Sequence, residues 1–237
     1  MRRVVFLRHG ESQYNVLKKF AGWLDCDLTA IGIRQAREAG RTLQEQGYSF
    51  DIAFSSELRR ARDTRYFLLD EMRLGDIPTF RSWRLNERHY GAFDDLTREE
   101  AELLFGKETM RLSREDFRFC PPASTRCEPL YFGEQPPAES APKSESMNDA
   151  TGRCLEYWQN SVVPAVRDGK RVLVVAHGEI LRLLTGHLLG MSEDEIVHAP
   201  VLRNATPLIL DFTDDFTVSD HRVLTESTEP TPLIKVV

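Results

Sequence analysis

Short, largely apolar runs alternate along the chain with longer segments in which apolar residues recur every three or four positions. The short runs predict strands at 4–7, 51–56, 79–83 and 206–212. The longer segments predict helices at 28–47, 57–72, 97–112 and 148–166, while 170–190 predicts a buried strand, a tight turn and an apolar helix. Because strands alternate with helices, we expect an α/β fold with a doubly wound, mostly parallel sheet and helices on both faces.

The stretch from about 97 to 145 interrupts this alternation. Its first part carries the helix expected at 97–112, with Leu103, Leu104 and Phe105 as the apolar residues. From 118 onward a long loop is expected, because proline recurs there, at Pro121, Pro122, Pro129, Pro136, Pro137 and Pro142. We therefore expect one domain over residues 1–237, with an excursion of helix and loop at about 97–145 that lies over the active site.

Net charge and hydropathy exclude two classes of binding partner, nucleic acid and membrane. The formal net charge of −6 offers no basic field to nucleic acid or to an anionic membrane, so an anionic ligand needs a local pocket. No apolar stretch reaches membrane-spanning length, and the N-terminus enters a strand without an apolar signal segment. We expect a cytoplasmic protein that binds neither nucleic acid nor membrane. The sequence is compatible with a monomer or a homo-oligomer.

The four cysteines show no paired spacing of the kind that binds a metal; they are Cys26, Cys120, Cys127 and Cys154. Reduced thiols are the expected state, which agrees with a cytoplasmic location. A disulfide between Cys120 and Cys127 is the alternative.

Two segments far apart in the chain share one form. VVFLRHG (4–10) and VLVVAHG (172–178) both run from an apolar strand into His-Gly. Ligand sites in open α/β sheets lie beyond the carboxyl ends of the strands. His9 and His177 would therefore meet if their strands are neighbours in the sheet.

Two further strand ends supply charged groups for the same edge. SSELRRARDT (55–64) opens a helix with Arg59, Arg60 and Arg62, and LNERHYG (85–91) supplies Glu87. Imidazole is a good nucleophile toward phosphorus, and guanidinium groups match phosphate oxygens in pairs. A carboxyl group with a raised pKa can protonate a leaving oxygen. The set predicts phosphoryl transfer without a metal, and the sequence contains no glycine-rich P-loop.

With these residues in place, the chain resembles the histidine phosphatase superfamily and, within it, the cofactor-dependent phosphoglycerate mutases. The resemblance spans nearly the whole chain and rests on motifs in order: LRHGESQYN (7–15), FAGWLDCDLTAIGIRQA (20–36), SSELRRARDT (55–64), LNERHYGA (85–92), ESM (145–147), YW (157–158) and AHGEILR (176–182). LNERHYGA matches the mutase form of the motif more closely than the general phosphatase form. The resemblance implies a phosphoglycerate mutase-like fold.

The resemblance also implies a role for individual residues. His9 is expected to become a phosphohistidine, and Glu87 to donate and accept the proton. The groups expected to hold the phosphoryl group are Arg8, Arg60, His177, Asn15 and the backbone of Gly178. Those expected to bind the rest of the substrate are Gly22, Tyr90, Arg98, which stands where the mutases have lysine, and Arg114.

The function that follows is a glycolytic and gluconeogenic phosphoglycerate mutase. It would interconvert 3-phosphoglycerate and 2-phosphoglycerate, with 2,3-bisphosphoglycerate as the phosphoryl primer and no metal. Several positions depart from the mutase pattern: Ala21, FDD (93–95), Glu115, Glu179 and RNAT (203–206). Glu115, Glu179 and RNAT favour a second hypothesis, a phosphomonoesterase that also uses a phosphohistidine. A binding or regulatory relative without catalysis is a third.

Each candidate also has an ordinary structural interpretation. Arg8 and His9 could form a solvated turn, and His177 could be a buried histidine without a catalytic role. Glu87 could be an ion-pair partner of Arg84 or Arg88. Arg98 and Arg114 could belong to solvated helix faces. Glu179 is expected either to turn away from the pocket or to pair with Arg60 or Arg182.

Overall fold

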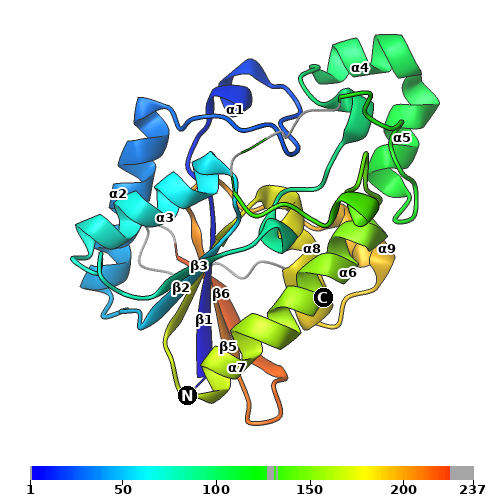
Figure 1. Ribbon diagram of the computed structural model, residues 1–237. Coiled ribbons are helices and arrows are strands. Elements are labelled where there is room, and N and C mark those ends of the chain that lie inside the picture. The colour runs from blue at the N-terminus through cyan, green and yellow to red at the C-terminus, as the bar shows by residue number, and fades with distance from the viewer. Residues whose placement is uncertain (1, 127–130, 132, 225–237) are drawn as a thin grey trace.

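The central element is a sheet with the strand order β3-β2-β4-β1-β5-β6 (Figure 1). The computed structural model describes residues 2–126, 131 and 133–224. Strands β1, β2, β3 and β4 run parallel, whereas β5 is antiparallel to β1 and β6 to β5. The bounds are β1 (Arg2–Arg8), β2 (Ile52–Ser55), β3 (Thr79–Arg81), β4 (Val172–Ala176), β5 (Pro207–Phe212) and β6 (Val218–Val223). The mostly parallel α/β fold is confirmed.

Helices cover both faces of the sheet, α2 and α3 on one side and α6 to α9 on the other (Figure 1). Those near the sheet are α2 (Ala30–Glu45), α3 (Arg59–Glu71), α6 (Met147–Tyr157), α7 (Val163–Arg167), α8 (Gly178–Leu188) and α9 (Glu193–His198), with a π-helix at Trp158–Val162 between α6 and α7. Above the carboxyl edge of the strands lie α1 (Gln13–Leu17), α4 (Arg98–Phe105) and α5 (Lys107–Glu115). Single 3-10 turns occur at Trp83–Leu85, Gly91–Phe93 and Ala138–Ser140.

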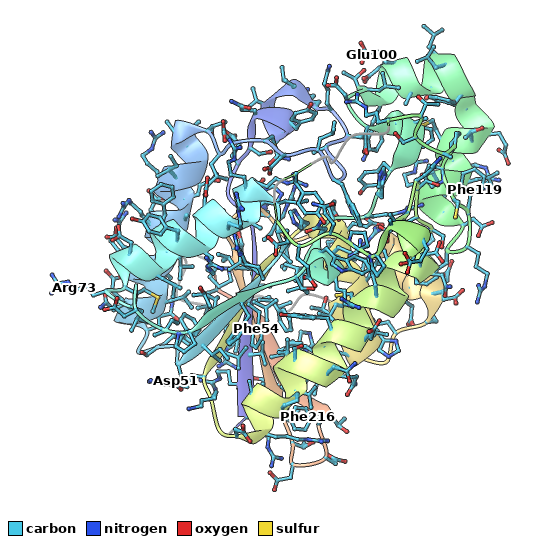
Figure 2. The ribbon with its side chains drawn as sticks, in the orientation of Figure 1. Asp51, Phe54, Arg73, Glu100, Phe119 and Phe216 are labelled. Carbon is cyan, nitrogen blue, oxygen red and sulfur yellow. The ribbon has the colours of Figure 1, made fainter. Side chains whose placement is uncertain are left out.

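The strands divide their side chains between two cores because successive residues of a strand point to opposite faces. Val4 and Phe6 pack with the helices α6 to α9, while Val5 and Leu7 pack with α2 and α3. Figure 2 shows the side chains that fill the space on both sides, with Phe54 of β2 in the first of these cores. Burial on both faces explains the unbroken apolar runs of β1 and β4.

The pairing of β1 with β4 brings the two His-Gly segments together. The strands are parallel neighbours, with Arg8 opposite Ala176. The His9 backbone N–H donates to the Ala176 carbonyl at 3.0 Å, one residue before His177. The expectation that the two histidine-bearing strands are neighbours is confirmed.

The structure differs from the local predictions in several places. The helix expected at 97–112 is two helices, α4 and α5, which Gly106 separates at φ 87°. Leu103 and Leu104 do not form an apolar contact face, since they are 86% and 65% exposed. The strand at 206–212 is followed by another, β6, a partly exposed edge strand whose sequence contains no apolar run. The short helices α1 and α9 were not predicted.

The segment from 118 to 145 has little regular structure where it is described, with one 3-10 turn at Ala138–Ser140. Cys127 lies outside the described residues, and the Cys120 thiol is 3.5 Å from an Asp149 carboxylate oxygen. Among the described helices, none has the length and apolar character needed to cross a membrane.

Candidate active site

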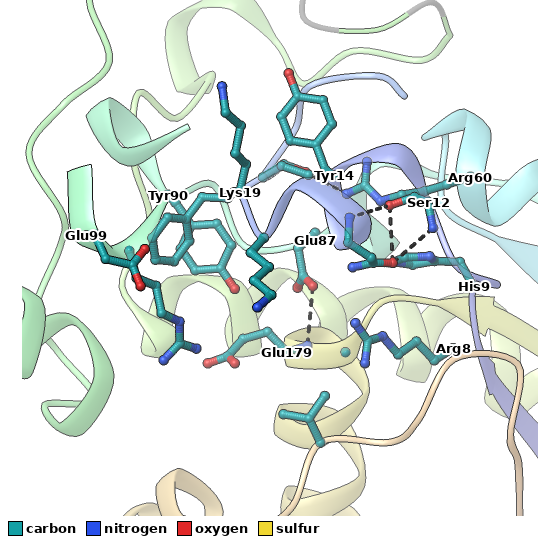
Figure 3. Close-up of a pocket in the computed structure, with 18 residues that line it drawn as sticks. Arg8, His9, Ser12, Tyr14, Lys19, Arg60, Glu87, Tyr90, Glu99 and Glu179 are labelled. Carbon is teal, nitrogen blue, oxygen red and sulfur yellow. Dashed lines mark hydrogen bonds between the residues drawn. The ribbon is translucent and has the colours of Figure 1, made fainter. Parts of the chain in front are cut away.

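A cavity of about 420 Å³ opens at the carboxyl ends of β1 and β4 (Figure 3). Most of the residues expected from the sequence line it: Arg8, His9, Asn15, Gly22, Arg60, Glu87, Tyr90, Arg98 and Gly178. His177 is fully buried beside His9, with 5.2 Å between the ring centroids. Arg114 is not among the lining residues; it is exposed on α5 and pairs with Glu115 at 3.1 Å.

His9 is held with one ring nitrogen available to the cavity. Its Nδ1 lies 2.7 Å from the Gly10 carbonyl, which accepts only if Nδ1 carries the proton. The lone pair therefore resides on Nε2. Burial lowers the pKa of His9 well below its usual range, and the cations Arg60 and Arg8 lower it further. The imidazole is neutral at pH 7 and is a nucleophile with a defined tautomer.

His177 has one ring nitrogen satisfied and one without a partner. Its Nε2 lies 2.7 Å from the Ser56 hydroxyl, and that hydroxyl also accepts from the Leu58 N–H at 3.1 Å. The hydroxyl can donate its proton to Nε2, and in that tautomer the proton of His177 is on Nδ1. Nδ1 is buried and has no partner among the described residues. In that tautomer Nδ1–H is a buried donor without a partner, which is costly unless a ligand oxygen accepts from it.

Arg8 and Arg60 are cations without a carboxylate partner among the described residues. Arg60 is 1% exposed, and its guanidinium donates to the carbonyls of Leu24 and Gly22 at 2.9 and 2.8 Å. Arg8 donates to the Leu202 carbonyl at 2.9 Å, while its Nε is buried without a partner. Carbonyl oxygens orient the two side chains but do not neutralise them. Uncompensated positive charge in a buried position favours a bound anion.

Asn15 presents its amide nitrogen to the cavity. Its Oδ1 accepts from the Ser12 N–H at 3.0 Å and from the Asn204 side-chain amide at 3.2 Å, so the NH₂ group points the other way. The Asn204 amide also donates to the His9 carbonyl at 2.8 Å. Asn204, part of the departure RNAT, therefore positions both His9 and Asn15.

Two glycines permit close packing around the cations. Gly178 begins α8, and a Cβ there would lie 2.6 Å from Val201 and 3.3 Å from the Arg8 guanidinium. Gly22 has φ 45°, and a Cβ there would overlap the Asp94 carboxyl group. Its carbonyl holds Arg60, so the contribution of Gly22 is to place that guanidinium.

Glu87 is the carboxyl group of the cavity. Its oxygens accept from the Arg88 N–H at 3.0 Å and from the Glu179 and Ile180 N–H groups at 3.3 Å each, at the start of α8. Burial raises the pKa of Glu87, and the Glu179 carboxylate raises it further. The raised pKa suits a general acid.

The alternative hypothesis, in which Glu87 is an ion-pair partner of Arg84 or Arg88, is wrong. Arg84 pairs with Glu156 at 3.4 Å, and the Arg88 guanidinium donates to backbone carbonyls, one of them of Glu145 at 2.8 Å. Neither arginine pairs with the Glu87 carboxyl group.

A buried ion pair missed by the sequence analysis holds the segment that carries Glu87. Arg153 of α6 pairs with Glu145 at 2.6 Å, and both side chains are buried. Arg153 also donates to the carbonyls of Arg84, Asn86 and Glu87 at 2.8, 2.9 and 3.0 Å. One guanidinium thus fixes three carbonyls of the Glu87 segment. The only signal in the sequence was the ESM motif that begins at Glu145.

The outer part of the cavity contains cations that the sequence analysis did not single out. Lys18 and Lys19 line it together with Arg98. Lys19 pairs with Asp95 at 3.1 Å, whereas Lys18 and Arg98 have no ion-pair partner among the described residues. Lys18 is the C-cap of α1 and has the left-handed backbone, with φ 54°, that ends many helices.

Glu179 also lines the cavity, and its carboxylate pairs with Arg182 at 2.7 Å. One of the two arrangements expected from the sequence, a pair with Arg182, is therefore confirmed. The charge of Glu179 stays at the cavity wall next to Glu87 (Figure 3).

His89 lies behind the site and makes the stability of the fold depend on pH. It is 3% exposed, its Nδ1 accepts from the Gly91 N–H at 3.0 Å, and burial lowers its pKa to about 4. The unfolded chain binds this proton near pH 6.5. The contribution of His89 to stability is therefore lost as pH falls from about 6.5 to 4, with a slope of about 1.4 kcal/mol per pH unit.

Urea unfolding between pH 7 and 4.5 measures this slope. We expect His89→Gln to flatten it by about 1.4 kcal/mol per pH unit, and His198→Gln, at an exposed position, to leave it unchanged. Equal slopes in the parent protein and in His89→Gln would contradict the assignment of a neutral buried His89.

Comparison with known proteins agrees with this geometry. The model of the histidine phosphatase superfamily (branch 1) matches residues 4–223. A mycobacterial glucosyl-3-phosphoglycerate phosphatase, solved with VO3, is 25% identical; the match covers 97% of this chain and 100% of that one, with a TM-score of 0.73. The alpha-ribazole phosphatase from Shigella flexneri, 23% identical, shares the fold over 91% of this chain and 93% of that one, with a TM-score of 0.69. The chain belongs to the histidine phosphatase superfamily, branch 1, a family of enzymes of phosphoryl transfer and hydrolysis.

Proposed function

We propose that the protein is a phosphomonoesterase that hydrolyses small phosphate esters through a phosphohistidine at His9. The observation that carries the proposal is the neutral His9 imidazole, with its lone pair on Nε2, between the uncompensated cations Arg8 and Arg60. The similar structures named above are phosphatases, which supports hydrolysis over the mutase reaction.

In the first step, Nε2 of His9 forms a bond to phosphorus as the bond from phosphorus to the ester oxygen breaks. Arg8, Arg60 and the Nδ1–H of His177 stabilise the charge on the phosphoryl oxygens. The protonated carboxyl group of Glu87 donates its proton to the leaving oxygen, and the alcohol departs.

In the second step, a water molecule attacks phosphorus while the bond to His9 Nε2 breaks. The Glu87 carboxylate accepts the proton of that water, which restores the acid form. Phosphate leaves, and the imidazole is neutral again. Each turnover therefore consumes one water and one ester and releases one alcohol and one phosphate.

The mutase reaction is the second candidate, because Tyr90 and Arg98, two residues that the resemblance to the mutases assigns to substrate binding, line the cavity. A 2,3-bisphosphoglycerate primer needs two anion sites. Arg8 and Arg60 would hold one phosphate, and Arg98 with Lys18 would hold the other. The carboxylates of Glu99 and Glu179, which line the same cavity, oppose a second phosphate. Hydrolysis needs only the inner site, so it is the reaction we favour.

One experiment separates these functions. Purified protein is incubated with phenyl phosphate, and separately with 3-phosphoglycerate and a trace of 2,3-bisphosphoglycerate, while phosphate, 2-phosphoglycerate and phosphoenzyme are measured. We expect phosphate release from several esters, faster than any isomerisation, and an acid-labile, base-stable phosphoenzyme. Rapid formation of 2-phosphoglycerate would establish the mutase instead, and the absence of any phosphoenzyme would favour a binding protein.

A further inference from the structure

Glu179 stands on the cavity wall without a part in either chemical step. Its backbone N–H donates to the Glu87 carboxyl group at 3.3 Å, and its own carboxylate is pinned by Arg182 at 2.7 Å. Figure 3 shows Glu87 and Glu179 as neighbours in the cavity, with a hydrogen bond from the start of α8 to the Glu87 carboxyl group. A carboxylate beside a phosphate site weakens the binding of the ligand, so its position requires an explanation.

The remaining charges that act on Glu87 are mostly positive. Arg8 at the end of β1 and Arg60 on α3 face it from the cavity, and Arg153 of α6 lies behind its backbone carbonyl. Lys18 lines the cavity as well, while Tyr90 is neutral because burial raises the pKa of its hydroxyl well above the usual range. Cations stabilise the ionised form of a carboxyl group, so Arg8 and Arg60 act against the burial that raises the pKa of Glu87.

The anion that opposes them is Glu179. Its like charge acts on Glu87 in the same direction as burial, against Arg8 and Arg60. The positive charge of Arg182 offsets part of the electrostatic effect of Glu179 on Glu87. Arg182 binds one carboxylate oxygen of Glu179, and another of its nitrogens donates to the Val197 carbonyl of α9 at 2.8 Å, so the guanidinium is held from both sides.

We propose that Glu179, restrained by Arg182, is a positioning residue that keeps the general acid Glu87 protonated and so sets the upper pH limit of ester cleavage. The proposal rests on the proposed function. It assigns opposite roles to the two partners: Glu179 holds the proton on Glu87, and Arg182 moderates that effect. A pair that only stabilises the start of α8 would not shift the pH profile in opposite directions.

The test is the pH profile of kcat/KM for phenyl phosphate in the parent protein, Glu179→Gln and Arg182→Gln. Activity falls at high pH as Glu87 loses its proton, and the midpoint of that fall is the readout. We expect Glu179→Gln to lower the midpoint by about 0.5–1 pH unit and Arg182→Gln to raise it. Glu115→Gln, on exposed α5, is the matched control and should leave it unchanged.

A second substrate shows that the shift belongs to the acid. The oxygen of p-nitrophenyl phosphate leaves without protonation, so its profile should depend much less on Glu179 than that of phenyl phosphate. An unshifted midpoint in Glu179→Gln, or shifts of one sign in both variants, would overturn the proposal. Absence of hydrolysis in the parent protein would instead overturn the proposed function. If Arg182→Gln does not fold, the comparison of the two substrates in Glu179→Gln decides.

Discussion

Replacement of His9 by asparagine is expected to abolish phosphoryl transfer while the protein stays folded. Asparagine can still donate to the Gly10 carbonyl, as Nδ1 of His9 does at 2.7 Å, but it has no nucleophilic nitrogen. We expect turnover to fall by at least about 10⁴-fold, since the covalent route is lost and only binding and charge stabilisation remain. Phosphate release and acid-labile, base-stable phosphoenzyme measure the loss, and thermal unfolding confirms the fold.

The control for this variant is His198→Asn. His198 lies on α9, where its side chain is 68% exposed and outside the cavity, so its replacement should leave phosphoenzyme formation intact. A phosphoenzyme that persists in His9→Asn would move the nucleophile to another group, first of all His177, the second buried imidazole of the site.

Replacement of Arg60 by methionine should produce the second large effect. Its guanidinium is buried, positively charged and without a carboxylate partner among the described residues. A preorganised donor of this kind contributes about 3–4 kcal/mol to transition-state stabilisation. We therefore expect kcat/KM to fall by about 10²–10³-fold. Arg60→Lys should recover part of the loss, because it restores charge without the paired N–H groups.

The neighbouring Arg59 offers a matched control. It precedes Arg60 on α3, but it is partly exposed and already paired with Asp27 at 2.6 Å. Exposed pairs contribute only about 0–1 kcal/mol to stability, so Arg59→Met should change kcat/KM by less than a few-fold. A loss below tenfold in Arg60→Met would show that this guanidinium does not bind the reacting phosphoryl group.

The two effects have one physical origin. Arg8 and Arg60 are held by the backbone carbonyls of Leu202, Leu24 and Gly22, so they do not have to rearrange when charge develops on the phosphoryl oxygens. The same cations help to keep His9 neutral. In the proposed mechanism, Arg8 and Arg60 therefore both keep His9 in its nucleophilic form and bind the phosphoryl group that it attacks.

Local sequence was sufficient to predict most of the sheet and the groups of the inner site. The apolar runs of β1 and β4 predicted strands buried on both faces, and parallel strands place their carboxyl ends at one edge. His9 and His177 directly follow these two strands, Arg60 lies at the start of the helix after β2, and Glu87 follows β3 after a 3-10 turn, so their convergence at one edge was predictable. The edge strand β6 was missed because its exposed side chains carry no apolar run.

The outer site and the electrostatics were decided by the tertiary structure. Arg98 lines the cavity and Arg114 does not, because Gly106 separates α4 from α5. The sequence showed the motif that contains Glu145 but not its ion pair with Arg153, which joins segments that only the fold brings together. By itself the sequence determined which groups gather at the edge of the sheet. Which of them carry a charge and which carry a proton depends on burial and on distances to other charges, and these exist only in the folded chain.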